Sequence, residues 1–256
     1  MDEFAEAHAK AMVVRDWLGA GIPSAGVGCA IARDRLAILD TRSERRGPFD
    51  ADSLTEDYEL GLRVAEAGAK VAFLRVRGSD GRLVATRAFF PRRLETAVRQ
   101  KTRWVCGIAL QGWDRMGWSG GIIDGWMRLR DRRGPMAALV LFAAYLLLIL
   151  SAVLLVAQHL GLARSLALTP LIGTLLVTNA VSLVWRSAFR GIFTAREYGA
   201  EEGVRAVLRI ALSNFIAILA GRRAVVQYVA SLRGAIVTWD KTEHRGHPSL
   251  VPGTSA

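Results

Sequence analysis

Two long stretches of this 256-residue chain, 136–158 and 165–185, lack any Asp, Glu, Lys or Arg. As helices rising about 1.5 Å per residue, they would be about 30–35 Å long, which matches a hydrocarbon core of about 30 Å. This pattern excludes a wholly soluble protein and a disordered chain. Cysteine is also scarce, with two residues, which excludes a disulfide scaffold. Residues 1–15 contain no apolar run, so we expect no cleavable signal peptide.

Basic residues outnumber acidic ones by 34 to 23, and they concentrate ahead of the first charge-free stretch. Residues 87–133 contain 11 basic and 4 acidic side chains. Such a belt is compatible with nucleic-acid binding, but beside a span it favours anionic lipid headgroups, so we predict a lipid bilayer and no nucleic acid as partner. Because positive residues stay cytoplasmic, we predict that residues 1–135 and the C-terminus face the cytoplasm.

Residues 1–135 predict an α/β domain. Apolar residues recur near every 3.6 positions in three segments, which indicates helices, and Ser53 and Glu56 match a capping box at the start of the second. Short apolar runs indicate strands. We expect helices over residues 2–18, 53–67 and 94–111, and strands over residues 29–32 and 70–76.

Residues 136–223 predict an α-helical membrane region with spans at about 136–158 and 165–185. Residues 206–221 are apolar, but these 16 residues fall short of the roughly 20 that a spanning helix needs. We therefore expect an interfacial or re-entrant helix there. Residues 224–256 predict an amphipathic helix followed by a polar tail.

Two short motifs carry most of the functional signal, and each alone is weak. Thr55, Glu56 and Asp57 open a predicted helix, where acidic residues also complement the helix dipole without any catalytic role. Residues 100–104 follow the pattern Gln-x-x-Arg-Trp, whose Arg and Trp are equally typical of a membrane interface. Their order, directly ahead of two predicted spans, favours a shared function.

Together the motifs resemble the TED and QxxRW motifs of membrane-integrated family 2 glycosyltransferases, which include cellulose, hyaluronan and poly-N-acetylglucosamine synthases. The chain is more similar still to one subgroup, the phage-adsorption protein B type of bacterial inner-membrane glycosyltransferase. The resemblance implies part of a glycosyltransferase A-type domain, followed by membrane helices. The residues that carry the closer resemblance are Phe90-Pro91-Arg92, Gln100 to Trp104, Gly107 to Trp113, Arg130-Asp131-Arg132 and Trp239-Asp240-Lys241-Thr242.

The resemblance implies catalytic roles at the first motif. Asp57 would be the general base that takes the proton from the acceptor hydroxyl, with Thr55 and Glu56 beside it in the catalytic motif. A helix N-terminus favours the ionised carboxylate that a base requires. The metal-binding D-x-D of the family precedes this motif by a longer stretch, so we interpret Asp50 and Asp52 as loop carboxylates.

The resemblance also implies substrate-binding residues. Arg103 would bind the phosphate oxygens of the leaving nucleotide diphosphate, since a guanidinium can hold them bidentately. Trp104 would stack on the acceptor sugar, and Gln100 would help close the site. Gly26 and Gly28 stand where the family places its acceptor-side loop, although a Gly-x-Gly segment alone also fits a simple turn.

The family builds its donor site, with Mg²⁺ or Mn²⁺, in a half-domain that we do not find ahead of Thr55. We predict no metal ligands in this chain and expect a fragment, a wrongly chosen start or a split enzyme completed by a partner subunit. The leading hypothesis is the acceptor-side and membrane half of an inverting glycosyltransferase that uses a nucleotide sugar, such as a UDP-sugar, and a glycan acceptor to make cell-surface polysaccharide. The alternative is a non-catalytic membrane scaffold or remnant subunit that binds a protein partner.

Overall fold

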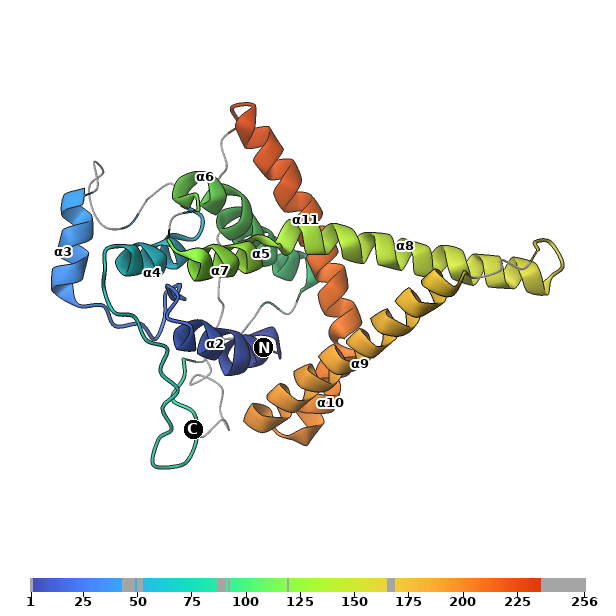
Figure 1. Cartoon of the computed structure of the whole chain (residues 1–256), viewed down its shortest axis with the longest axis horizontal. Helices are drawn as coiled ribbons and strands as arrows, with labels where there is room; N and C mark the ends of the chain where they lie inside the picture. The colour runs from blue at the N-terminus through green and yellow to red at the C-terminus, as the bar shows by residue number, and fades with distance from the viewer. Residues whose placement is uncertain are drawn as a thin grey trace.

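Two long helices form a hairpin that extends from a cluster of shorter helices (Figure 1). The hairpin consists of α8 (Gly134–His159) and α9 (Pro170–Tyr198), and a third long helix, α11 (Ile210–Leu232), runs across its base. All three are long and apolar enough to cross a membrane. The fold is taken from a computed structural model, which describes residues 2–42, 49, 53–86, 91, 93–118, 120–164 and 169–235.

The helix predicted over residues 2–18 is confirmed, as three consecutive segments. They are α1 (Asp2–Glu6), the π-helical η1 (Ala7–Ala11) and α2 (Met12–Trp17). Gly19 follows with φ 69°, a left-handed conformation that ends helices readily. The later helix α3 (Arg33–Arg42) was not predicted, because its mostly charged sequence has no clear apolar face.

The two predicted strands are wrong for the described residues, and the α/β class is not confirmed. Residues 70–76 are extended and alternate between exposed and half-buried, as a strand would, but no neighbouring strand in the described chain pairs with them. The one β-bridge there joins Arg77 to Leu83. Residues 29–32 also lack a pairing partner. Strands depend on hydrogen bonds to neighbours, which a local apolar run cannot reveal.

Helix α4 (Glu56–Glu66) carries the first motif and confirms the predicted helix, but its capping box does not form. Thr55 is the N-cap residue and makes no side-chain capping bond. Ser53 stands too far ahead of the first turn, and its hydroxyl donates instead to Oε1 of Glu59. Gly68, with φ 83°, follows the helix end.

The helix predicted over residues 94–111 is confirmed, although its last part is π-helical. It comprises α5 (Leu94–Val105) and η2 (Cys106–Gln111), which lead into α6 (Gly112–Met116) and then α7 (Ile122–Arg132). Short π-helical insertions are frequent at functional sites. This one directly follows the Gln-x-x-Arg-Trp motif.

Long helices are present where the two spans are predicted, but the bounds of α9 and the division of the later helices differ from the prediction. Helix α9 continues well past residue 185 to Tyr198, and residues 165–168 lie outside the described chain. The helices expected at 206–221 and 224–239 are instead α10 (Ala200–Leu208) and the single helix α11. Arg222 and Arg223 do not interrupt α11, because arginine is a good helix former. Residues 236–256 lie outside the described chain.

Small residues let α11 pack closely on the helices that bear the motifs. Gly221 faces Ala138 of α8, where a β-carbon would clash. Ala224 is fully buried with Leu54 and Cys106, and the Thr102 hydroxyl donates to the carbonyl of Ala220 at 3.5 Å. The core therefore joins α11 to α5, η2 and the residue that precedes the first motif.

Candidate active site

Asp57 lies in the first turn of α4, half-buried beneath a glycine loop. Its Oδ1 atom accepts a hydrogen bond from the backbone N–H of Tyr58 at 2.8 Å. A β-carbon on Gly26 would stand 2.7 Å from the other oxygen, Oδ2. Gly26 and Gly28 both have positive φ, 72° and 63°. The structure thus brings Gly26 against the predicted base, while Gly28 contacts Thr86 instead.

The segment just before this loop, residues 22–24, packs against α4 at Gly61, one turn after Asp57. Gly61 has no side chain, and the backbone of residues 22–24 occupies the space where a β-carbon would project. A larger residue at position 61 would push this loop away from the helix. Gly61 and Gly26 together therefore hold the loop over the start of α4.

Thr55 faces η2, the segment that follows the second motif, rather than the glycine loop. Its side chain is buried, and its Oγ1 atom has no hydrogen-bond partner within the described part of the chain. A β-carbon on Gly107 of η2 would stand 2.6 Å from that oxygen. Glu56, by contrast, is half-buried beside Asp57 in the first turn. Through Thr55 and Gly107 the first motif therefore contacts η2, the segment that follows the second motif.

Gln100, Arg103 and Trp104 lie on α5, one to two turns before Gly107. Arg103 and Gly107 are four residues apart, so they share one helix face about 6 Å apart along the axis. Gln100 is buried, whereas Arg103 and Trp104 are half-buried. Trp104 packs edge-on against Phe4 of α1, with ring centroids 5.8 Å apart. Among the described residues, no hydrogen bond or ion pair links these three side chains to Asp57.

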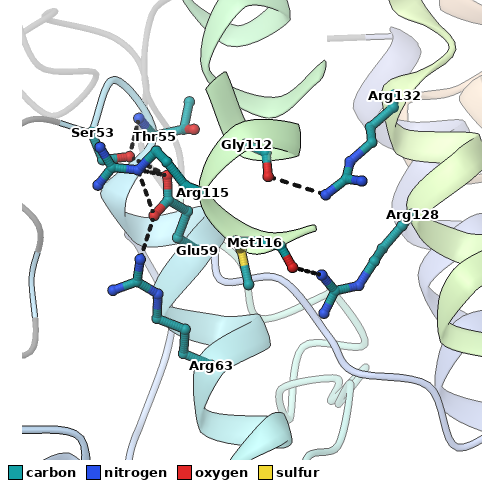
Figure 2. Close-up of polar contacts among 9 residues, drawn as sticks. All are labelled: Ser53, Thr55, Glu59, Arg63, Gly112, Arg115, Met116, Arg128 and Arg132. Carbon is teal, nitrogen blue, oxygen red and sulfur yellow. Dashed lines mark hydrogen bonds and ion pairs between the residues drawn. The ribbon is translucent and has the colours of Figure 1, made fainter. Parts of the chain in front are cut away.

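A buried carboxylate that the sequence analysis missed stabilises the start of α4 (Figure 2). Glu59 is 2% exposed and accepts from the Ser53 hydroxyl at 2.7 Å and from Arg63 Nη2 at 3.0 Å. Arg115 of α6 places its Nε 3.0 Å from Glu59 Oε1. The Ser53 oxygen in turn accepts from the N–H of Thr55 at 3.2 Å. The only sequence pattern that could have indicated this group is the spacing of Glu59 and Arg63, since oppositely charged residues four apart on a helix can form an ion pair.

A second missed group joins α4 to α7, the helix that directly precedes the hairpin. The Tyr58 hydroxyl donates to Asp131 Oδ2 at 2.7 Å, and Arg15 Nη1 lies 2.7 Å from the same oxygen. Burial, and then the nearby Asp131 carboxylate, raise the pKa of Tyr58. The tyrosine therefore remains a hydrogen-bond donor, and α2, α4 and α7 converge on one carboxylate.

Further contacts fix the inner side of α7. Asp124 Oδ1 accepts from the N–H of Gly21 at 2.9 Å. Arg128 pairs with Glu66 of α4 and donates to the Met116 carbonyl at 2.9 Å, and Arg132 donates to the Gly112 carbonyl at 3.1 Å (Figure 2). None of these long-range contacts has a local sequence signature.

The described residues do not fit a Mg²⁺ or Mn²⁺ site. Among them, no group of three or more His, Cys, Asp or Glu side chains could hold a metal ion. Asp50 and Asp52 lie outside the described chain. We therefore derive no catalytic step through a metal.

Comparison with known proteins assigns the family. The family described as "Glycosyl transferase family group 2" matches residues 1–185. The chain belongs to this family. It is similar to bacteriophage adsorption protein B of Escherichia coli strain K12 and to bacteriophage N4 adsorption protein B of Escherichia coli O157:H7.

Both relatives are 34% identical to this chain over an alignment 275 positions long, gaps included, which covers 99% of this chain. The chain spans 37% of the length of each relative. No solved structure matches it. The family thus assigns a glycosyltransferase domain, and the described helices provide its membrane association.

Proposed function

We propose that this chain is the acceptor-side and membrane half of an inverting, nucleotide-sugar-dependent glycosyltransferase that contributes to cell-surface polysaccharide synthesis. The observation that carries the proposal is the position of Asp57. Its carboxylate lies at the N-terminal end of α4 and is covered by a loop that approaches closely because residue 26 is glycine. A helix N-terminus stabilises an ionised carboxylate, the form that accepts a proton.

In this proposal Asp57 takes the proton from an acceptor hydroxyl as the hydroxyl oxygen attacks the anomeric carbon of the donor sugar. The bond from that carbon to the diphosphate oxygen breaks, and the nucleotide diphosphate leaves with the bonding electrons. Arg103 stabilises the negative charge that develops on the phosphate. Trp104 stacks on the acceptor sugar, and Gln100, buried one turn before it on α5, helps close the site.

We further propose that the donor site, with its Mg²⁺ or Mn²⁺, is supplied by a further N-terminal half or by a partner subunit. The extended segment 70–76 supports this proposal. It presents alternate side chains to the helices. Its Val76 carbonyl accepts from the N–H of Val84, but residues 70–75 pair with no strand in the described chain, so this part is available to join a sheet. Leu74 and Val76 on its outer face are exposed.

We also propose that the catalytic domain and the C-terminus lie on the cytoplasmic side of a bacterial inner membrane. In this arrangement α8 and α9 cross the bilayer, whereas α11, which packs on α5 and η2, stays on the side of the catalytic domain. Arg130 and Arg133 precede α8, and Arg186, Arg190 and Arg196 occupy the end of α9 that returns to the same side. Positive residues at both of these ends agree with retention in the cytoplasm.

The test replaces Asp57 with asparagine in the source cells and measures surface glycan per unit of membrane-inserted protein. We expect glycan synthesis to fall by about 10²–10⁴-fold at normal protein level, the usual contribution of a general base. The matched control is Asp34→Asn on the exposed surface of α3, which should leave synthesis unchanged. Unchanged glycan with Asp57→Asn would instead support the non-catalytic scaffold.

The proposal that the donor site is supplied from elsewhere is tested separately, by equilibrium binding of UDP-sugars. The purified chain should have no measurable affinity for UDP-sugars, and measurable affinity would contradict the proposal that the donor site is supplied from elsewhere.

A further inference from the structure

An open pocket of about 400 Å³ lies near the C-terminal end of α7, outside the candidate active site. It is lined by Trp126, Leu129, Arg130 and Arg133. The lining is mainly apolar, with the indole and the leucine side chain among its walls, and the two arginines bring positive charge to the pocket. This combination fits an amphiphilic ligand with an anionic group.

The orientation of α7 is fixed by its opposite face. Arg128 and Arg132 point inward, are 3% and 8% exposed, and donate to backbone carbonyls. Arg130 and Arg133 lie on the outward side, and no carboxylate of the described residues pairs with either of them. Arg128 and Arg132 of α7 thus complete the fold, while Arg130 and the C-cap residue Arg133 are available to an external anion.

The pocket lies at the boundary of the membrane. Arg133 immediately precedes α8, and the charge-free stretch begins at Met136. At about 1.5 Å per residue, Arg130 is about 4.5 Å and Trp126 about 10 Å before Arg133 along the helix. These distances from the start of α8 place both residues in the headgroup layer, where Trp and Arg are favoured next to a spanning helix.

We propose that this pocket binds the headgroup of an anionic phospholipid from the leaflet on the side of the catalytic domain. Arg130 and Arg133 contact the phosphate, while Trp126 and Leu129 pack against the glycerol and the first carbons of the acyl chains. The inner face of the same helix holds Tyr58 of α4 through Asp131. A bound lipid therefore fixes the height of α4, and with it Asp57, relative to the membrane surface.

Native mass spectrometry of the full chain in detergent tests this site, with phosphatidylglycerol as the probe and phosphatidylcholine as the zwitterionic comparison. We expect tighter retention of phosphatidylglycerol by the wild type. The double variant Arg130→Gln/Arg133→Gln should weaken phosphatidylglycerol binding by about 25-fold, from about fivefold for each surface arginine. The double lysine variant, which keeps both charges, should retain most of the binding.

The matched control removes two exposed arginines that do not line the pocket, Arg33→Gln/Arg82→Gln, and should bind phosphatidylglycerol like the wild type. Equal binding of both lipids, or no loss in the glutamine variant, would overturn the proposal. Displacement of the lipid by millimolar inorganic phosphate would also overturn it, because the pocket would then be a free-phosphate site. The binding readout requires no glycosyl transfer, so its failure is distinct from failure of the proposed activity.

Discussion

The Oδ2 atom of Asp57 lies 2.7 Å from the point where a β-carbon on Gly26 would stand. Position 26 requires glycine for two reasons. A β-carbon would clash with the Asp57 carboxylate, and the backbone φ of 72° is strained for any residue with a side chain. The closeness of the two residues explains how a loop more than 30 positions earlier in the sequence can cover the predicted base.

Gly26→Ala should therefore abolish activity by displacing either the loop or the Asp57 carboxylate. We expect a loss of about 100-fold or more in glycan formed per unit of membrane-inserted protein, since small misplacements at a reacting centre have effects of this size.

The control is Gly19→Ala, which has nearly the same φ, 69°, but nothing within 4 Å of its β-carbon. Both variants should lose about 1 kcal/mol of stability from the left-handed backbone. Equal activity in the two variants would show that the contact with Asp57 is irrelevant.

Gly107→Ala should destabilise the contact between η2 and the first motif. Its β-carbon would stand 2.6 Å from Oγ1 and 2.7 Å from Cγ2 of the buried Thr55 side chain, which has no free space to enter. Overpacking of this kind costs about 1–3 kcal/mol, measurable as a lower thermal midpoint of the purified chain.

Gly125→Ala on α7 is the matched helical control, because nothing lies within 4 Å of its β-carbon. It should be neutral or stabilising by up to about 1 kcal/mol, from the better helix propensity of alanine. A thermal midpoint for Gly107→Ala as high as that of Gly125→Ala would contradict the packing that joins Thr55 to η2.

The sequence was sufficient for the features that local patterns determine. Charge-free runs located α8 and α9, because a membrane span requires a continuous apolar sequence. Apolar residues at every third or fourth position located α4 and α5, because such helices bury one face. Helix α11 was divided wrongly because Arg222 and Arg223 suggested an end, whereas arginine is compatible with a helix interior.

Pairings between distant segments could not be predicted from these patterns. Arg115 lies 56 residues after Glu59, and Asp131 lies 73 residues after Tyr58, so neither contact has a local signature. The strand predicted over residues 70–76 has the right alternation, but its pairing depends on a second strand. The catalytic and binding roles of Asp57, Gln100, Arg103 and Trp104 came from the family resemblance and remain predictions.

His8 should make the fold less stable in mild acid. Its ring lies between Phe4 and Phe73, with centroids 5.9 and 5.8 Å away. Burial, and then the charge of Arg75, lower the pKa of His8 below the ordinary 6.5. Because the unfolded chain then binds the proton first, stability should be full above about pH 6.5 and fall as the pH drops toward the lowered pKa.

Thermal unfolding between pH 7.5 and 5.5 measures this effect. The thermal unfolding midpoint of the wild type should fall more over that pH interval than the midpoint of His8→Gln, which has no imidazole to protonate. His159→Gln, at the exposed end of α8, should follow the wild type. Parallel curves for the wild type and His8→Gln would show that this histidine does not link stability to pH.

Glu59→Gln should destabilise the chain far more than the same substitution at Glu95. Both glutamates pair at 3.0 Å with an arginine four residues later, Arg63 and Arg99 respectively, but Glu59 is 2% exposed and Glu95 is 76% exposed. Removing one partner from a fully buried ion pair costs about 3–5 kcal/mol. The cost here should be smaller, because the side chains of Arg63 and Arg115 are 31% and 18% exposed. An exposed pair of this spacing contributes only about 0.3–0.5 kcal/mol.

Chemical denaturation of the two variants in the same detergent gives the comparison. Because Glu59 also accepts from Ser53, whose oxygen binds the N–H of Thr55, Glu59→Gln should loosen the start of α4 and reduce activity as well. The carboxylate of Glu59 makes these bonds from the same first turn of α4 as Asp57, so it acts by positioning the first motif rather than by touching substrate. If Glu59→Gln and Glu95→Gln unfold at the same denaturant concentration, the buried carboxylate does not hold the start of α4.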